Sequence, residues 1–235
     1  MLQVEDIVIA RRDFRLRASF ELAAASRTAM IGPSGGGKSS LLASVAGFLQ
    51  LQSGQIRIAG HAMDGVVPGQ RPLSIVFQDN NLFPHMTARQ NVGLGVRCDL
   101  RLDRDEKARV STALERVGLK SFGDELPGRL SGGQQSRVAL ARILVQRRPW
   151  ILLDEPFAAL GPALRSEMLQ LVKSWCDESH AGLLMVTHDP RDALSICENT
   201  IVVANGKASP PVDSGELFTD PPQSLSSYLG RDWRC

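Results

Sequence analysis

The stretch MIGPSGGGKSSLLAS, residues 30–44, decides the fold prediction because it places four glycines and a lysine between an apolar run and a helix-forming run. Gly32, Gly37, Lys38 and Ser39 match the pattern G-x-x-x-x-G-K-[ST]. In that pattern, small residues let backbone N–H groups surround phosphate oxygens, and the following helix adds its positive end. A glycine-rich turn that only caps a helix is the alternative, which the position between a strand and a helix disfavours.

The residues of this phosphate loop have separate expected tasks. Lys38 is expected to place its charge on the β- and γ-phosphates of a nucleotide, and Ser39 to offer its hydroxyl to magnesium. The predicted phosphate-binding residues are Gly32, Pro33, Ser34, Gly35, Gly36, Gly37, Lys38, Ser39 and Ser40.

Composition places the chain among ordinary globular proteins. Its 235 residues are 43% hydrophobic and 22% charged, with a net charge of +2 and no basic block, so no nucleic-acid partner is expected. The N-terminus has no signal-peptide pattern, and no window approaches the ~18 consecutive apolar residues typical of a membrane-spanning helix. The four cysteines form no C-x-x-C pair, which favours a reduced cytosolic protein without disulfides. Any membrane role would therefore depend on a partner.

Strand and helix patterns alternate along most of the chain. Apolar runs bounded by turn formers favour strands, whereas the segment from Thr87 to Gln146 is rich in Leu, Ala, Arg, Lys and Glu and favours a helical insertion. Thr87 with Gln90, and Ser131 with Gln134, have capping-box spacing. The predicted strands are 53–61, 71–78, 151–155, 182–188 and a hairpin at Asn205-Gly206, and the predicted helices are 38–46, 162–176 and 190–196. This alternation predicts an α/β fold with a mainly parallel sheet.

A second group of candidate residues follows the apolar run of ILLDEP, residues 151–156. Its carboxylates, Asp154 and Glu155, come at the carboxyl end of a predicted strand, where ligands of α/β sheets bind. Asp154 is expected to hold magnesium, and Glu155 to orient or deprotonate a water. Gln78 and His188 each end a predicted strand and can reach the same edge, although alone each is more often a structural polar residue.

The stretch LSGGQQSR, residues 130–137, carries a second glycine pair at a helix start. A capped amphipathic helix explains Ser131 and Gln134, but Gly132 and Gly133 each lower helix propensity by about 1 kcal/mol relative to alanine. Bare N–H groups at a helix N-terminus form another anion site. Two phosphate-binding features in one chain are explained if each serves half of a shared site.

These motifs together resemble the ATP-binding subunits of ABC transporters over essentially the whole chain. The resemblance rests on GPSGGGKS, Gln78 in VFQDN, LSGGQ, ILLDEP and VTHD, all in the family's order. It implies a P-loop NTPase (RecA-like) core with a mixed sheet, an N-terminal antiparallel β subdomain and an inserted α-helical subdomain. A single domain over residues 1–235 is expected, with the catalytic core at 1–86 and 149–235 and the helical subdomain at 87–148.

The resemblance also implies a reaction, a cofactor and an assembly. ATP and Mg²⁺ would bind between two copies arranged head to tail, with the phosphate loop of each copy facing residues 131–134 of the other. Gln78 would contact magnesium and the attacking water, Glu155 would act as general base, and His188 would contact the γ-phosphate. Hydrolysis would separate this homodimer and drive alternating access in membrane subunits.

Within the family, stretches such as LLASVAGFL and LLDEPFAALGPALRSEML are most similar to the ATPases of thiamine importers. This likeness implies uptake of thiamine, with thiamine phosphates and iron left open, because other subunits recognise the transported molecule. The expected partners are integral membrane permease subunits and, indirectly, a periplasmic substrate-binding protein. The expected location is the cytoplasmic face of the inner membrane, where residues 82–84 would either dock the permease or pack on their own subdomain.

Three positions depart from the family's pattern. Arg11 stands where an adenine-stacking aromatic residue is common, and its guanidinium can stack on a base instead, with Phe14 as the less suited substitute. Gly161 replaces the aspartate of the usual S-A-L-D, and Gln135 replaces an arginine frequent after LSGGQ. We expect these departures to reduce activity without abolishing it.

Three alternative functions remain open on the sequence. An ABC exporter shares every catalytic motif and differs only outside them. A soluble ABC protein of DNA maintenance would need a long coiled-coil insertion or zinc modules, and this sequence contains neither. A non-enzymatic nucleotide-binding module is disfavoured by the presence of Lys38, Asp154, Glu155 and His188.

Overall fold

The computed structural model describes residues 1–11 and 14–229. Contacts between residues divide the chain into two compact units. The first unit comprises Met1–Leu73, Pro149–Asp154 and His180–Cys235, and the second comprises Ser74–Arg148 and Glu155–Ser179. The expected helical subdomain, residues 87–148, lies inside the second unit, which also contains residues 74–86 and 155–179; the subdomain bounds stay a prediction.

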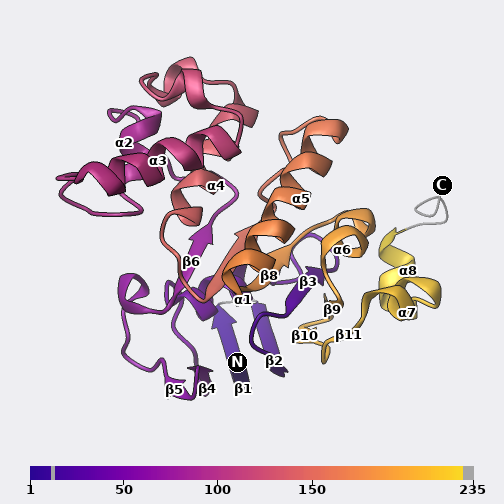
Figure 1. Cartoon of the computed structure of the whole chain (residues 1–235). Helices are drawn as coiled ribbons and strands as arrows, with labels where there is room; N and C mark the ends of the chain where they lie inside the picture. The colour runs from indigo at the N-terminus through magenta and orange to yellow at the C-terminus, as the bar shows by residue number, and fades with distance from the viewer. Residues whose placement is uncertain (12–13, 230–235) are drawn as a thin grey trace. The chain divides into compact units, whose positions relative to one another are not determined.

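The first unit is built on a mixed β-sheet with strand order β5-β4-β1-β2-β10-β9-β3-β8-β7 (Figure 1). Its antiparallel part contains β1 (Leu2–Arg11), β2 (Phe14–Leu22), β4 (Ser53–Ile58) and β5 (His61–Ala62). Its parallel part contains β3 (Arg27–Ile31), β7 (Trp150–Asp154), β8 (Gly182–Val186) and β9 (Asn199–Ala204). The short strands β10 (Lys207–Ala208) and β11 (Val212–Asp213) both pair with β9. The predicted α/β class with an N-terminal antiparallel part is confirmed.

The two parts of the sheet differ in burial, as their sequences require. β7 and β8 are buried at every position, which matches their unbroken apolar runs and is typical of parallel strands covered on both faces. β2 alternates between buried and exposed positions, so only one of its faces joins the core. The core therefore lies around the parallel strands that lead to the candidate site.

Helix α1 (Lys38–Ala46) follows β3 and has the bounds that the sequence predicts. It ends at Gly47, whose φ of 88° places it in the left-handed region, and the Gly47 N–H donates to carbonyls of the last helical turn. Leu41, Leu42 and Val45 bury its apolar face completely. The other helices of this unit are α6 (Pro190–Ile196), α7 (Ser214–Thr219), α8 (Gln223–Leu229) and the 3₁₀ turn η1 (Pro68–Gln70).

The second unit is mainly helical. The strand β6 (Leu73–Val76) leads into α2 (Ala88–Gly93), α3 (Arg104–Arg116), the 3₁₀ turns η2 (Lys120–Phe122) and η3 (Pro127–Arg129), α4 (Gly132–Leu144) and α5 (Pro162–Ser179). Both predicted capping boxes, at Thr87 and Ser131, are present, and Asp103 forms a third at the start of α3. Helices α2, α3 and α4 pack against one another, which confirms the predicted helical insertion.

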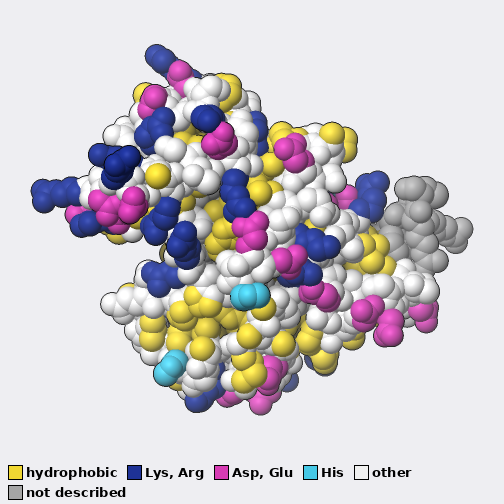
Figure 2. Space-filling model, viewed as in Figure 1, with side chains coloured by type: hydrophobic (Ala, Val, Ile, Leu, Met, Phe, Trp, Pro, Cys, Tyr) yellow, Lys and Arg dark blue, Asp and Glu magenta, His cyan; other side chains and the backbone are white. Residues whose placement is uncertain are grey.

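Charged side chains of both signs are interspersed on the face shown in Figure 2, where Lys and Arg alternate with Asp and Glu.

The asparagine–glycine pair predicted to turn a hairpin does so, because Asn205 (φ 52°) and Gly206 (φ 70°) join β9 to β10. Among the described residues, no helix is both long enough and apolar enough to cross a bilayer.

Candidate active site

The phosphate loop connects β3 to α1 and depends on glycine at both of its ends. Gly32 has φ 149°, and a Cβ placed there would lie 2.1 Å from the carbonyl oxygen of Val203 on β9. Gly37 has φ 98°, and a Cβ there would lie 2.3 Å from Cζ of Phe14. Neither position can hold an ordinary side chain, so the loop passes close to β9 and β2 with its backbone exposed to a ligand.

Lys38 is the first residue of α1 and is buried. Its Nζ donates to the carbonyl oxygens of Gly32 at 2.7 Å and Pro33 at 2.9 Å. The ammonium group therefore lies inside the curve of the loop, where the sequence pattern predicts phosphate binding.

Ser39 and Asp154 come from different elements and meet directly. The Ser39 hydroxyl, on α1, donates to Oδ1 of Asp154 at the end of β7, over 3.0 Å. Both carry the oxygen ligands that magnesium prefers, and magnesium keeps several waters and binds substrate phosphates besides one or two carboxylates. The described residues contain no cluster of three or more His, Cys, Asp or Glu side chains suited to a metal. One carboxylate and one hydroxyl beside a phosphate loop thus fit a magnesium ion that arrives with a nucleotide.

His188 follows β8, which pairs in parallel with β3. The N–H of Thr187 donates to the carbonyl of Met30 at 3.1 Å, so the two strands reach the same edge of the sheet beside the phosphate loop. The buried Thr187 hydroxyl donates to Oδ2 of Asp192 at 2.9 Å, and Asp189 caps α6. These bonds fix the backbone on both sides of His188, whose side chain is exposed.

Arg11 and Phe14 face each other across β1 and β2, while residues 12–13 lie outside the described part of the chain. Arg11 is exposed, and its proposed stacking on adenine stays a prediction. Phe14 was the less suited candidate from the sequence, yet its ring is the aromatic group that contacts the phosphate loop at Gly37. Sequence spacing alone does not reveal this contact because it depends on how β2 packs on the loop.

Glu155 follows Asp154 directly but leaves the strand. Its φ of 47° is uncommon for a residue with a side chain, and such strain is typical of functional sites. The predicted strand 151–155 therefore ends one residue early, at Asp154. A compact turn follows, in which the buried Phe157 accepts a hydrogen bond from the N–H of Leu160 at 3.0 Å.

Gln78 is exposed just after β6, in a loop that two features of the second unit hold in place. Asn91 is fully buried on α2, and its amide exchanges hydrogen bonds with the backbone of Phe83 and also donates to Met86 and Thr87. Arg142 of α4 contacts the same loop at Asn80 and Asn81. Neither Asn91 nor Arg142 belongs to the candidates from the sequence, because their partners are backbone carbonyls and N–H groups that no residue type marks.

The start of α4 gives structural roles to Ser131 and Gln134 of LSGGQ. Ser131 and Gln134 form a reciprocal capping box, with bonds of 3.3 Å and 2.8 Å. A Cβ on Gly133 would lie 2.7 Å from a terminal methyl carbon of Leu160, so a larger residue there would require that methyl group to move. Gly132 has more room, since the nearest atom to an added Cβ would be 3.8 Å away on Ala159. The first two residues of α4, Gly132 and Gly133, therefore present their N–H groups without side chains.

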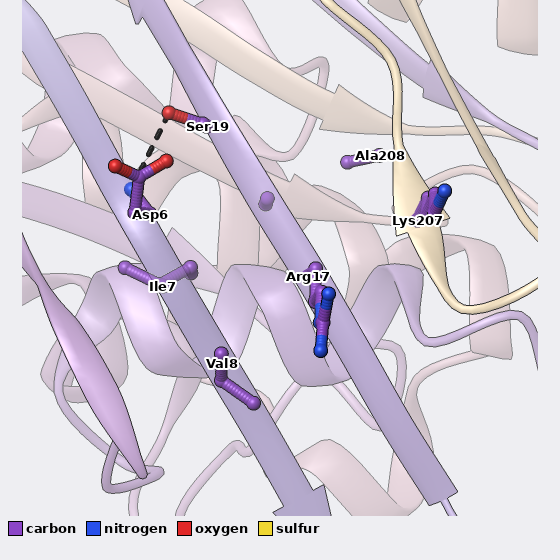
Figure 3. A pocket seen from close by; sticks show the side chains of 8 residues that line it. Asp6, Ile7, Val8, Arg17, Ser19, Lys207 and Ala208 are labelled. Carbon is purple, nitrogen blue, oxygen red and sulfur yellow. Dashed lines mark hydrogen bonds between the residues drawn. The ribbon is translucent and has the colours of Figure 1, made fainter.

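A separate pocket of about 350 Å³ lies on the antiparallel part of the first unit (Figure 3). It is lined by β1, β2 and β10, and Asp6 donates its N–H to the Ser19 hydroxyl at its edge. Arg17 and Lys207, which are register partners, also line it. None of the candidate residues lines this pocket, so the motif residues rather than this pocket define the site.

The first unit thus brings together the phosphate loop, Asp154 and the backbone that carries His188. Gln78, Glu155 and residues 131–134 belong to the second unit, and their assigned roles stay predictions.

Comparison with known proteins agrees with this arrangement. Residues 16–158 match the family model described as ABC transporter. The thiamine import ATP-binding protein ThiQ of Cereibacter sphaeroides is 53% identical over 98% of this chain and 100% of its own length, and that of Escherichia coli is 42% identical over 98% and 99%. The solved ATP-binding cassette MJ0796, dimeric and bound to ADP and Pi, superposes with a TM-score of 0.82 at 26% identity, covering 91% of this chain and 99% of that chain. The chain therefore belongs to the ABC transporter family, as one of its ATP-binding and ATP-hydrolysing subunits.

Proposed function

We propose that this chain is the ATPase of an ABC importer that takes up thiamine or thiamine phosphates. The observation that carries the proposal is near full-length similarity, at 42–53% identity, to proteins named as thiamine import ATP-binding proteins. Similarity over whole chains includes the surfaces outside the catalytic motifs, and those surfaces determine which membrane subunits an ATPase serves. The substrate itself is recognised by those other subunits.

Binding of ATP begins at the phosphate loop. The backbone N–H groups of residues 32–37 and the N-terminus of α1 surround the phosphates, and Lys38 exchanges its carbonyl partners for phosphate oxygens. Ser34 and Ser40 contribute to the same phosphate-binding segment, and Arg11 stacks on the adenine. In this proposal the triphosphate lies at the carboxyl ends of β3, β7 and β8, the edge at which ligands of α/β sheets bind.

Magnesium would be held by Ser39, Asp154 and Gln78 together with phosphate oxygens, and when bound it supplies neutralisation of charge that develops on those phosphates. The Ser39–Asp154 contact of 3.0 Å supports two of these three ligands. Glu155 accepts a proton from the attacking water, Gln78 orients that water, and His188 donates a hydrogen bond to the γ-phosphate. These groups stabilise charge where it forms, which is the main demand of phosphoryl transfer.

Two copies of the chain are proposed to complete each other's sites. The N–H groups at the start of α4, with Ser131, Gly132, Gly133 and Gln134, contact the ATP held by the other copy's phosphate loop. The dimeric state of the cassette MJ0796, bound to ADP and Pi, supports such an arrangement. Hydrolysis removes the γ-phosphate that both copies hold, and the dimer opens.

The opening of this dimer is proposed to drive permease subunits in the inner membrane, with the ATPase bound at their cytoplasmic face. The apolar loop that contains Phe83, which is 45% exposed, is a suitable contact for them. A periplasmic substrate-binding protein would deliver the substrate to the permease from the other side.

The test is uptake of labelled thiamine by cells that lack this chain and receive it back unmodified or as Lys38→Ala. Uptake should fall on deletion and return only with the unmodified chain. If deletion leaves uptake unchanged while the purified chain still hydrolyses ATP, the thiamine assignment is wrong and the ATPase assignment survives.

A further inference from the structure

Arg142 joins the last turn of α4 to the loop that follows Gln78, entirely within the second unit. Its Nη1 donates to the carbonyl of Asn81 at 2.8 Å, and its Nη2 donates to the carbonyl of Asn80 at 2.9 Å. The side chain is half-buried, and burial lowers the pKa of the guanidinium, which nevertheless stays charged at neutral pH. A charged group in this setting is retained because two carbonyl oxygens satisfy it.

The loop needs such a partner because its backbone is strained. Asn80 has φ 58° and Asn81 has φ 46°, so two consecutive residues with side chains occupy the left-handed region. Backbone of this kind persists only where the surroundings hold it, and asparagine tolerates it better than most residues. The Asn80 N–H donates to the Phe77 carbonyl at 2.9 Å, which closes a turn around Gln78 itself.

We propose that Arg142 is a positioning residue for ATP hydrolysis, which clamps the Asn80 and Asn81 carbonyls and thereby fixes the direction of the Gln78 side chain. This inference rests on the proposed function, which assigns Gln78 to magnesium and the attacking water. Helix α4 carries residues 131–134 at its first turn and Arg142 at its last. The Gln78 loop is therefore tied to the helix whose other end is proposed to bind the second copy's ATP.

The geometry requires arginine in particular. Its planar guanidinium presents two parallel donors to two neighbouring carbonyls, whereas a lysine ammonium is a single point that reaches one of them well. Arg142→Gln removes the charge and both hydrogen bonds of the guanidinium. Arg142→Lys retains the charge but only part of the hydrogen bonding to the two carbonyls.

The experiment measures kcat, the KM for ATP and the Mg²⁺ concentration for half-maximal rate, with the full-length chain. The variants are Arg142→Gln, Arg142→Lys, Gln78→Ala and the double variant Arg142→Gln/Gln78→Ala. We expect Arg142→Gln to lower kcat about tenfold, below the ~10²-fold cost of a fully misplaced group, and to raise the Mg²⁺ requirement. The KM for ATP should stay within about twofold, because the phosphate loop belongs to the first unit. Arg142→Lys should give an intermediate kcat.

The double variant decides between positioning and mere stability. If Arg142 acts through Gln78, the double variant is no slower than Gln78→Ala alone. If the double variant instead lowers kcat by the product of the two single losses, the inference is overturned, because Arg142 would then act independently of Gln78. A Gln78→Ala chain with unchanged kcat would also overturn it. Thiamine uptake by cells that carry or lack the unmodified chain tests the proposed function separately, because that comparison involves no Arg142 variant.

Arg116→Gln is the matched control for lost stability. Arg116 lies in the same unit and donates to both carboxylate oxygens of Glu178, at 2.7 Å and 2.6 Å, without touching the Gln78 loop. Because this ion pair is exposed, its loss should lower the melting temperature only slightly and should leave kcat and the Mg²⁺ requirement unchanged. An equal loss of kcat in Arg116→Gln and Arg142→Gln would reduce the role of Arg142 to stability and overturn the inference.

Discussion

The Ser39 hydroxyl donates a hydrogen bond of 3.0 Å to the Asp154 carboxylate, across a separation of 115 positions in the chain. This bond joins α1, the helix that follows the phosphate loop, to the last residue of β7. It brings together at the end of β7 the two oxygen-bearing side chains that we propose as magnesium ligands, so their contact is a property of the fold itself.

Asp154→Asn should separate the charge of this position from its hydrogen bond. The amide oxygen can still accept from Ser39, so the melting temperature should change little, but the lost negative charge should raise the Mg²⁺ concentration for half-maximal ATP hydrolysis by about tenfold or more. Titration of the rate with Mg²⁺ at fixed ATP measures this. Ser39→Thr keeps a hydroxyl that the pattern allows and should behave like the unmodified chain. An unchanged Mg²⁺ requirement in Asp154→Asn would remove Asp154 from the metal site.

Glu155→Gln should stop ATP hydrolysis while leaving ATP binding intact. Removal of a general base lowers kcat by about 10²–10⁴-fold. Glutamine and glutamate should fit the left-handed backbone at this position equally well. Single-turnover hydrolysis and equilibrium binding of ATP measure the two effects. Glu167→Gln, an exposed carboxylate on α5, is the control and should hydrolyse ATP normally. If the Glu155→Gln chain hydrolyses ATP as fast as the unmodified chain, another residue must act as the base.

Gly37→Ala should cost more stability than Gly35→Ala. Both positions have positive φ, 98° and 74°, but only at Gly37 would the new Cβ meet the Phe14 ring, whereas nothing lies within 4 Å at Gly35. Backbone strain costs about 1–2 kcal/mol at either site, and overpacking adds about 1–3 kcal/mol at Gly37. Urea unfolding of both variants measures the difference. In a Phe14→Leu background the difference should shrink, although a methyl carbon of Leu16 would still lie 3.2 Å from the added Cβ. An undiminished difference would exclude the ring as its cause.

Gly182→Ala should destabilise the core of the first unit. A Cβ at this position on β8 would lie 2.5–2.7 Å from ring atoms of Trp150 on the neighbouring β7. Overpacking of this kind costs about 1–3 kcal/mol, or about 2–4 °C in melting temperature for each kcal/mol. Calorimetry gives the shift. Gly69→Ala, where an added Cβ meets nothing within 4 Å, is the control, and equal melting temperatures for the two variants would contradict the prediction.

Gly161→Asp should raise ATP turnover by restoring the residue usual after the acidic pair. An added Cβ at Gly161 has nothing within 4 Å, and the position directly precedes α5, where Asp and Asn cap a helix equally well. We expect about a threefold gain in kcat, equivalent to roughly 0.6 kcal/mol of activation free energy. Gly161→Asn is the matched control, because it supplies the cap without the charge. Equal rates in the two variants would show that the missing carboxylate does not limit turnover.

Elements with strong local signals could be predicted to the residue. Helix α1 lies between glycines in the left-handed region, and α6 begins with an aspartate cap and a proline, so both have their predicted bounds. Boundaries set by backbone strain could not be predicted. The strand 53–61 is interrupted at Ala59 and Gly60, with φ 51° and 80°, and the strand 151–155 stops before Glu155, with φ 47°. The choice of a left-handed conformation by alanine or glutamate depends on packing that no short pattern records.

The residues at the candidate site also divide into those that sequence patterns reveal and those that they do not. Lys38, Ser39 and Asp154 could be found because their chemistry needs particular side chains at fixed spacing, and the Ser39–Asp154 contact joins two of them. Arg142 and Asn91 could not be found, because each holds the Gln78 loop through backbone groups that every residue possesses. A similar case is Arg71, a buried guanidinium that donates to carbonyls at the end of α1 and in the loop after β5.

The bonds from Lys38 to the carbonyls of Gly32 and Pro33 also bear on the thermodynamics of nucleotide capture. The loop already has its curved form around the ammonium, so binding need not order a disordered segment, and this lowers the entropic penalty of association. The gain in enthalpy is smaller for the same reason, since phosphate oxygens replace two carbonyl acceptors instead of water. Affinity at this loop therefore depends on an exchange of acceptors within a preorganised shape, and the preorganisation itself favours binding.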